Sequence, residues 1–113
     1  MKYILFCAAC FLSLTLFSLE YEVQFENADI SMVRVKIMPK EEIGYHRDAL
    51  PQIVVALQGG TITRLEANGT TTEVQFPTGV AIYREIDPPD ELHLSVNYGS
   101  EPVELIIVQL KNR

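Results

Sequence analysis

The sequence has few cysteines and no excess of positive charge. Its two cysteines, Cys7 and Cys10, lie within the first ten of 113 residues, so the rest of the chain can form no disulfide and offers no thiolate to a metal ion. The formal net charge is −6, and the basic residues form no patch of the kind that binds a phosphate backbone. Any metal site beyond this start must use histidine, carboxylate or amide ligands, and we expect no nucleic-acid partner.

The chain also lacks linkers, internal repeats and low-complexity segments. Hydrophobic residues make up 48% and charged residues 21%, which is the composition of a folded globular protein, and the length suits one domain. No serine lies in a Gly-x-Ser-x-Gly turn, so the sequence carries no hydrolase signature of that type.

Residues 1–18 differ in kind from the rest. They read MKYILFCAACFLSLTLFS, in which Lys2 is followed by an uncharged apolar run that ends at a small residue. This layout is typical of a secretory signal peptide, and we expect cleavage near Ser18 and a secreted or periplasmic protein. Because the run is short for a membrane span, an uncleaved anchor is the second interpretation and lipid attachment at Cys10 the third. Residues 19–113 then form the single mature domain.

The mature chain is a series of short segments rich in β-branched and aromatic residues, and no helical pattern competes with them. The predicted strands are 21–26, 32–38, 53–58, 61–66, 72–76, 80–86, 92–97 and 103–110. Between them, Gly59-Gly60 and Asn68-Gly69 are interpreted as hairpin turns, the second in preference to a glycosylation sequon at Asn68. The regular spacing of strands and turns predicts an all-β sandwich or barrel.

Two predicted strands, 53–58 and 103–110, are apolar on both faces. Such strands need cover on both sides, either from another layer of the same chain, formed by 21–38, or from a second subunit. We predict a homodimer that buries one outer sheet face through residues 53–57 or 105–110.

Several polar side chains have spacings that could form a metal site. His46 and Asp48 are two residues apart, so both side chains point to one side of an extended chain, and Gln52 begins the next strand. The other histidine of the sequence, His93, lies on the polar side of strand 92–97. Spacing alone leaves two alternatives, a metal site or polar residues on ordinary strands.

These residues belong to two motifs that resemble those of the cupin superfamily. The first family motif runs His-x-His, three or four residues, Glu, six residues, Gly, and the second runs Pro-x-Gly, two residues, His, three residues, Asn. Here the first reads His46-x-Asp48, three residues, Gln52, six residues, Gly59, and the second reads Pro88-x-Asp90, two residues, His93, three residues, Asn97. The resemblance covers roughly residues 33–111 and implies an antiparallel double-stranded β-helix, the cupin or jelly-roll barrel.

The resemblance also implies a metal site. In metal-holding cupins, the two histidines and the glutamate of the first motif join the histidine of the second around one ion. The corresponding residues here are His46, Asp48, Gln52 and His93, of which Asp48 and Gln52 depart from the usual types. Two imidazoles, a carboxylate and an amide oxygen still suit a divalent Fe, Mn, Ni or Zn ion. The alternative is a degenerate cupin that keeps the barrel without the ion.

Two functions follow from this resemblance. In the first, an exported barrel binds a small molecule and no catalytic residue is assigned. In the second, a divalent ion held by His46, Asp48 and His93 acts on a small organic substrate. The sequence shows no distinct general base, which favours the first function. Three arginines are interpreted as solvated partners of acidic residues, with an anionic ligand at the barrel mouth as the alternative: Arg47, Arg64 and Arg84.

Overall fold

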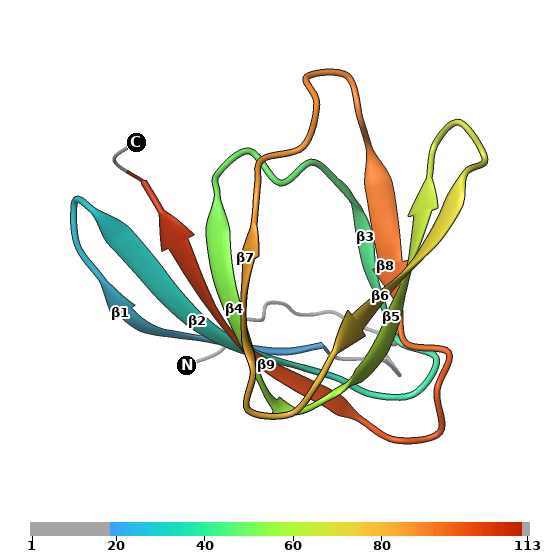
Figure 1. Cartoon of the computed structure of the whole chain (residues 1–113), viewed down its shortest axis with the longest axis horizontal. Coiled ribbons are helices and arrows are strands. Elements are labelled where there is room, and N and C mark those ends of the chain that lie inside the picture. Colours follow the sequence, from blue (N-terminus) through green and yellow to red (C-terminus); the bar gives the residue numbers. More distant parts are fainter. Residues whose placement is uncertain (1–18, 112–113) are drawn as a thin grey trace, which may run out of the picture.

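The computed structural model describes residues 19–111, which form nine β-strands and no helix. The strands are β1 (Glu20–Glu26), β2 (Ile30–Ile37), β3 (Glu42–His46), β4 (Gln52–Gln58), β5 (Gly60–Glu66), β6 (Thr71–Phe76), β7 (Ala81–Arg84), β8 (His93–Val96) and β9 (Val103–Leu110). They form two facing sheets, with the strand orders β1-β2-β9-β4-β7 and β3-β8-β5-β6 (Figure 1). All neighbouring strands are antiparallel, so the predicted antiparallel all-β barrel is confirmed.

The expected signal peptide, residues 1–18, lies outside the described residues. From residue 19 to residue 111, no helix has the length and apolar character needed to cross a membrane.

Each of the eight predicted strands overlaps an observed one, and 103–110 matches at both ends. The strand that the sequence did not predict is β3, which reads EIGYH. It contains one β-branched residue and an interior glycine, so it lacks the composition by which the other strands are identified.

The hydrophobic core fills the space between the sheets. Val35 and Ile37 of β2 are buried on its inner face and pair across the register with Leu105 and Val103 of β9. Ile62 and other buried residues approach from the opposite sheet. Because alternate residues of a strand point to the same face, this apolar alternation turns one face of β2 toward the core. Each buried apolar side chain contributes about 1.5–3 kcal/mol to the stability of the fold.

The prediction of a hairpin at Gly59-Gly60 is wrong. β4 and β5, which flank Gly59, belong to different sheets, so this point is a corner where the chain crosses from one sheet to the other. A Cβ atom on Gly59 would lie 2.0 Å from the Phe76 carbonyl oxygen and 2.7 Å from the Thr78 nitrogen. The glycine is therefore required by the close approach of the backbone rather than by a two-residue turn.

The predicted turn at Asn68-Gly69 is confirmed. It joins β5 to β6, and Gly69 has a φ angle of 95°, in the left-handed region that glycine adopts without strain. The Thr70 N–H donates a 2.8 Å hydrogen bond to Asn68 Oδ1. The Asn68 side chain thus holds the turn from inside.

Candidate metal and ligand site

Four strand ends that carry polar side chains meet at one end of the barrel. His46 is the last residue of β3 and Gln52 the first of β4, while Arg84 ends β7 and His93 begins β8. In Figure 1 the β3–β4 and β7–β8 loops both lie at the top of the barrel. Antiparallel pairing therefore brings together residues that are nearly fifty positions apart in the sequence.

A β-bulge directs His46 into the barrel. Along the β3–β8 register, Ile43 pairs with Ser95 and His46 pairs with His93, so β3 has one more residue than β8 between these pairs. In a regular strand, residues 43 and 46 would point to opposite faces. The extra residue reverses the alternation, and Ile43 and His46 both line the same pocket.

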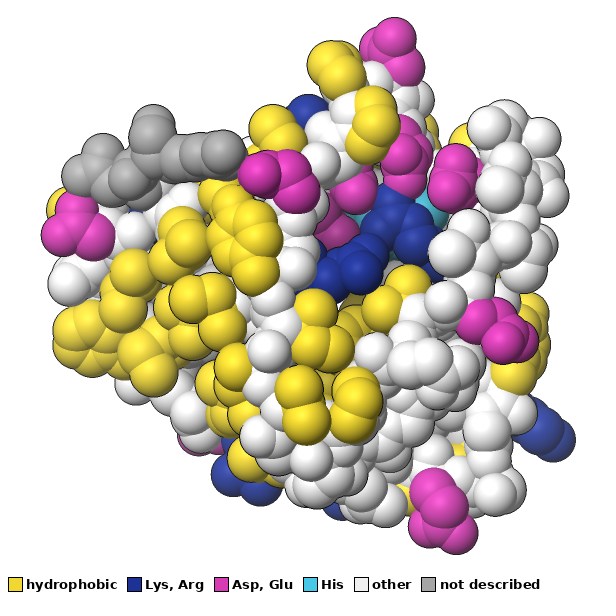
Figure 2. All heavy atoms as spheres, in the orientation of Figure 1, with side chains coloured by type: hydrophobic (Ala, Val, Ile, Leu, Met, Phe, Trp, Pro, Cys, Tyr) yellow, Lys and Arg dark blue, Asp and Glu magenta, His cyan; other side chains and the backbone are white. Residues whose placement is uncertain are grey.

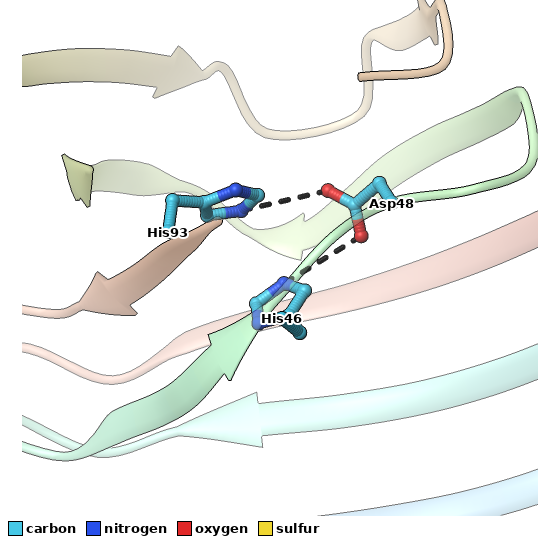
Figure 3. Close-up of side chains that lie close together, drawn as sticks. All are labelled: His46, Asp48 and His93. Carbon is cyan, nitrogen blue, oxygen red and sulfur yellow. Dashed lines mark ion pairs between the residues drawn. The ribbon is translucent and has the colours of Figure 1, made fainter. Parts of the chain in front are cut away.

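The two imidazoles and the Asp48 carboxylate converge. His46 Nε2 lies 3.5 Å from Asp48 Oδ1, and His93 Nε2 lies 3.6 Å from Asp48 Oδ2. The imidazole centroids are 4.4 Å apart with an interplanar angle of 58°. Figure 3 shows each ring directing one nitrogen toward its own oxygen of the carboxylate. The predicted meeting of His46 and His93 across the pocket is confirmed.

The opposite nitrogen of each ring faces an acceptor. His46 Nδ1 lies 2.6 Å from the Gly44 carbonyl oxygen, which can only accept, so Nδ1 carries a proton, and in the neutral ring it is Nε2 that has the lone pair facing Asp48. His93 Nδ1 lies 3.4 Å from Asp87 Oδ2 but makes no hydrogen bond, although the residue is only 1% exposed. Both rings therefore turn Nε2 toward the shared carboxylate and Nδ1 away from it.

A buried charge cluster lies behind His93. The Arg64 guanidinium contacts Asp87 Oδ1 at 3.0 Å and forms a short contact with the Glu91 carboxylate. Burial lowers the pKa of Arg64, but its hydrogen bonds and charge interactions with both carboxylates outweigh that effect and raise it. The sequence interpretation of Arg64 as a solvated residue is wrong, because its side chain is only 11% exposed.

The charges around His93 and Asp87 set their protonation. Burial and then the positive charges of Arg64 and His46 lower the pKa of His93, and they outweigh the two nearby carboxylates. Burial acts to raise the pKa of Asp87, but hydrogen bonds from the Asp48 N–H and the Arg64 guanidinium outweigh it and lower that pKa. At neutral pH, His93 is therefore neutral with a lone pair to offer, and Asp87 is ionised.

The site forms part of the wall of a pocket between the two sheets. The pocket opens to solvent and has a free volume of about 100 Å³, which is smaller than the roughly 300–1,000 Å³ of most small-molecule sites and limits a ligand to a small size. Gln52 lines it together with His46, Asp48 and His93, so the structure places all four predicted ligand residues around one cavity. In Figure 2, Lys or Arg, Asp or Glu, and His side chains gather around a hollow. Its apolar lining includes Ile37, Val54, Ile62, Val74, Phe76 and Leu105.

Asn97, the last residue of the second motif, has a structural role. It is 1% exposed, and its Nδ2 donates to the carbonyl oxygens of Ile37 and Glu101 at 2.9 and 2.8 Å. Its Oδ1 accepts a 2.9 Å hydrogen bond from the Gly99 N–H. The side chain therefore joins the end of β2 to the β8–β9 loop and does not line the pocket.

Solved structures identify the fold. A cupin domain from Bordetella pertussis Tohama I matches with a TM-score of 0.73 and 19% identity, covering 88% of this chain and 99% of that chain. An RmlC-like cupin with a double-stranded β-helix fold from Methanocaldococcus jannaschii matches with a TM-score of 0.63 and 12% identity, covering 88% of this chain and 85% of that one. The polyketide cyclase RemF from Streptomyces resistomycificus has a TM-score of 0.60 and 16% identity, covering 84% of this chain and 66% of that one.

These similarities show that the chain has the cupin fold, so the fold implied by the two sequence motifs is confirmed. No family model matches the sequence, and no curated protein matches it. Function must therefore be argued from the geometry of the site.

Proposed function

We propose that this protein binds a small organic molecule in the pocket between its sheets, beside a divalent metal ion held by His46, Asp48 and His93. The observation that carries the proposal is the orientation of the two imidazoles. Each turns Nε2 toward the Asp48 carboxylate and turns Nδ1 toward a carbonyl or carboxylate oxygen. In histidines that bind metals, an acceptor at Nδ1 fixes the tautomer and leaves Nε2 free to bind, and the Gly44 carbonyl is hydrogen-bonded to His46 Nδ1 in this way.

The separations of the ligand atoms support the same proposal. Two atoms that each bind an ion at about 2.1 Å with a tetrahedral angle lie roughly 3.4 Å apart. The two Nε2 to Asp48 oxygen distances are 3.5 and 3.6 Å. In a neutral His46 whose Nδ1 carries the proton, the Nε2 lone pair faces an oxygen lone pair, and this repulsion is relieved by a metal cation or a second proton between them.

The donor set favours a transition metal. Two imidazole nitrogens and one carboxylate, with the Gln52 amide oxygen as a weak fourth donor, suit Fe, Mn, Ni or Zn rather than calcium or magnesium. The Asp87 carboxylate lies 3.4 Å from His93 Nδ1, on the side where metal-bound histidines have an acceptor, although no hydrogen bond joins the two.

A metal-dependent enzyme acting on a small organic substrate is the second candidate. Three protein ligands leave coordination positions open, as in catalytic rather than structural sites, and RemF, whose fold is similar, is a polyketide cyclase. When bound, the ion would supply a Lewis acid or an oxygen-activating centre. No carboxylate or histidine outside the ligand set lines the pocket among the described residues, so we assign no general base.

The test is to measure metal directly in protein purified without a metal-binding tag. We expect elemental analysis to find a transition metal, and we expect chelator-treated protein to bind one Mn²⁺, Ni²⁺ or Zn²⁺ per chain in calorimetric titrations. His46→Ala should abolish binding, whereas Ser95→Ala, at another polar position of the pocket wall, should retain it. If no metal binds, or if His46→Ala binds as wild type does, the metal site is rejected.

A further inference from the structure

We propose that the pocket recognises a small monocarboxylate with an apolar carbon body, and that Arg84 binds its carboxylate group. The inference rests on the proposed function, since it names the class of molecule that the same pocket binds. It does not require that the metal ion be present.

The first observation is that the arginine side chains differ in whether they have hydrogen-bond or ion-pair partners. Four of them lie within residues 19–111, and three have partners. Arg34 binds Glu104, Arg47 donates to two carbonyl oxygens of the β7–β8 loop, and Arg64 binds two carboxylates. The Arg84 side chain makes no hydrogen bond or ion pair with any residue in this part of the chain. The sequence contains 15 acidic and 9 basic residues, so a shortage of acidic partners does not explain this.

The second observation is where Arg84 lies. On the inner face of the five-stranded sheet, Val54 of β4 pairs with Ile82 of β7, and two residues further along Gln52 pairs with Arg84. The face therefore changes from apolar to polar in a single step toward the barrel mouth. Arg84 and Gln52 both line the pocket, and the Arg84 side chain is half-buried. Its guanidinium thus belongs to the rim of a cavity with an apolar floor.

The remaining charges at the rim leave Arg84 as the available cation. The charge of Arg64 is compensated by Asp87 and Glu91, although Arg64 also lines the pocket. Asp48 faces the two histidines, and the two positive charges of a divalent ion bound there would exceed the single negative charge of Asp48. With the ion in place, the rim attracts an anion from both the metal site and Arg84.

The anion that fits best is a carboxylate. A guanidinium presents parallel N–H donors that match the two oxygens of a carboxylate, and such a charge-assisted pair supplies both strength and orientation. Without the ion, Arg84 is the one uncompensated cation among the described residues that line the pocket, which matches a monoanion rather than a phosphate dianion. The apolar floor, to which Ile62, Phe76 and Leu105 contribute, excludes a second charged group and suits a short alkyl chain or a single ring.

The experiment compares matched pairs of acids and amides. Pentanoate and benzoate are titrated against pentanamide and benzamide by NMR, in metal-free and metal-loaded protein, with the Arg84 Nε–H signal as a local reporter. We expect the carboxylates to bind with Kd of about 1 mM or tighter and the neutral amides at least about tenfold more weakly. The metal-loaded protein should bind the carboxylates more tightly than the metal-free protein.

Arginine variants assign the effect to one side chain. Arg84→Gln should weaken carboxylate binding about tenfold or more and leave amide binding unchanged. Arg84→Lys should have an intermediate affinity, because it keeps the positive charge without the parallel N–H donors of a guanidinium. Arg34→Gln is the matched control, because it removes the same charge from a residue paired with Glu104 outside the pocket. Because Arg84 ends a strand and is half-buried, the Arg84 variants should keep the dispersed spectrum of the folded protein.

The inference is overturned if acids and amides bind alike, if Arg84→Gln binds carboxylates as wild type does, or if Arg34→Gln is equally impaired. It is also overturned if no carboxylate binds at roughly 10 mM. Metal calorimetry on the same samples separates the two proposals. Carboxylate binding that depends on Arg84 without any metal binding would reject only the metal site, and metal binding without carboxylate binding would reject only this inference.

Discussion

Asp48 and Asp87 are joined by two hydrogen bonds that run in opposite directions. The Asp48 N–H donates to Asp87 Oδ2 at 2.8 Å, and the Asp87 N–H donates to the Asp48 carbonyl oxygen at 2.9 Å. The pair ties the β3–β4 loop to the β7–β8 loop. Because the Asp87 carboxylate is also held by Arg64, the position of the Asp48 carboxylate at the candidate metal site depends on the buried charge cluster.

The first prediction concerns the charge of the metal site. Asp48→Asn removes the carboxylate of the ligand set, so metal affinity should fall by more than about 100-fold, beyond the 10–100-fold typical of losing an outer hydrogen-bond partner. Gln52→Glu adds a negative charge in the same pocket and should tighten binding about tenfold. The two variants should therefore respond in opposite directions in calorimetric titrations with Mn²⁺, Ni²⁺ and Zn²⁺.

The matched control for this prediction is Asp90→Asn, which makes the same chemical change at an exposed loop position. It should bind metal as wild type does. Equal affinity of wild type and Asp48→Asn would remove the metal site, and the barrel would then be interpreted as a metal-free binding protein.

The second prediction concerns the stability of the buried cluster. Arg64→Met leaves the carboxylates of Asp87 and Glu91 without their cation, so the free energy of unfolding should fall by about 3–5 kcal/mol. Arg34→Met removes an exposed ion pair with Glu104 and should cost at most about 1 kcal/mol. Chemical denaturation of both variants measures the difference, and equal losses would show that the cluster contributes no more than a surface pair.

The third prediction is the pH dependence of metal binding. Protons compete with the ion for the Nε2 atoms, so affinity should fall as pH drops below the usual histidine pKa of about 6.5. Burial, followed by the positive charges of Arg64 and His46, lowers the pKa of His93, so this nitrogen takes up its proton at a more acidic pH than a free histidine. Once it titrates, affinity should fall by about tenfold per pH unit for that proton.

Calorimetry between about pH 5 and pH 8 tests the third prediction, with imidazole ¹⁵N shifts reporting the protonation of each ring. Affinity that is the same at both ends of this range would contradict histidine ligation.

The sequence predicts features that depend on local pattern, and misses those that depend on contacts across the sheets. Strands such as β9 have strong β composition, and the resemblance of the two motifs to those of cupins implies that His46, Asp48, Gln52 and His93 lie around one pocket, as they do in the structure. The bulge at β3 depends on its pairing with β8. The single glycine in EIGYH is typical of a bulge but does not predict the pairing partner.

The buried charge cluster cannot be predicted from the sequence, because it too depends on contacts between distant segments. Arg64 meets Asp87 and Glu91 across 23 and 27 residues, where a strand of one sheet contacts the loop that follows β7. Each of these residues taken alone has the properties of a surface residue. Only the topology shows that the three charges are buried together.

The outer face of the five-stranded sheet is a further apolar feature of the described residues. Ile53 of β4 pairs with Val108 of β9 and with Tyr83 of β7, and Met32 of β2 also pairs with Val108. These residues lie on the face opposite the buried Val54, and Tyr83 is 55% exposed. Figure 2 shows a broad group of hydrophobic side chains on the side where β1, β2, β9 and β4 lie. Because β1 and β2 extend this sheet edge to edge, they cannot cover it, and cover of the outer face by residues 21–38 is ruled out.

The last prediction is that this face is buried in a homodimer. Large apolar patches on soluble proteins usually mark contact surfaces, and a two-fold dimer would bury the same patch of both chains. Val108→Lys places a charge at its centre, so it should convert the dimer to a monomer in light scattering at high micromolar concentration. Tyr45→Lys, at a residue of the other sheet that is 58% exposed, should leave the dimer intact. A wild-type chain that is monomeric under these conditions would reject the dimer, and so would a Val108→Lys variant that remains dimeric.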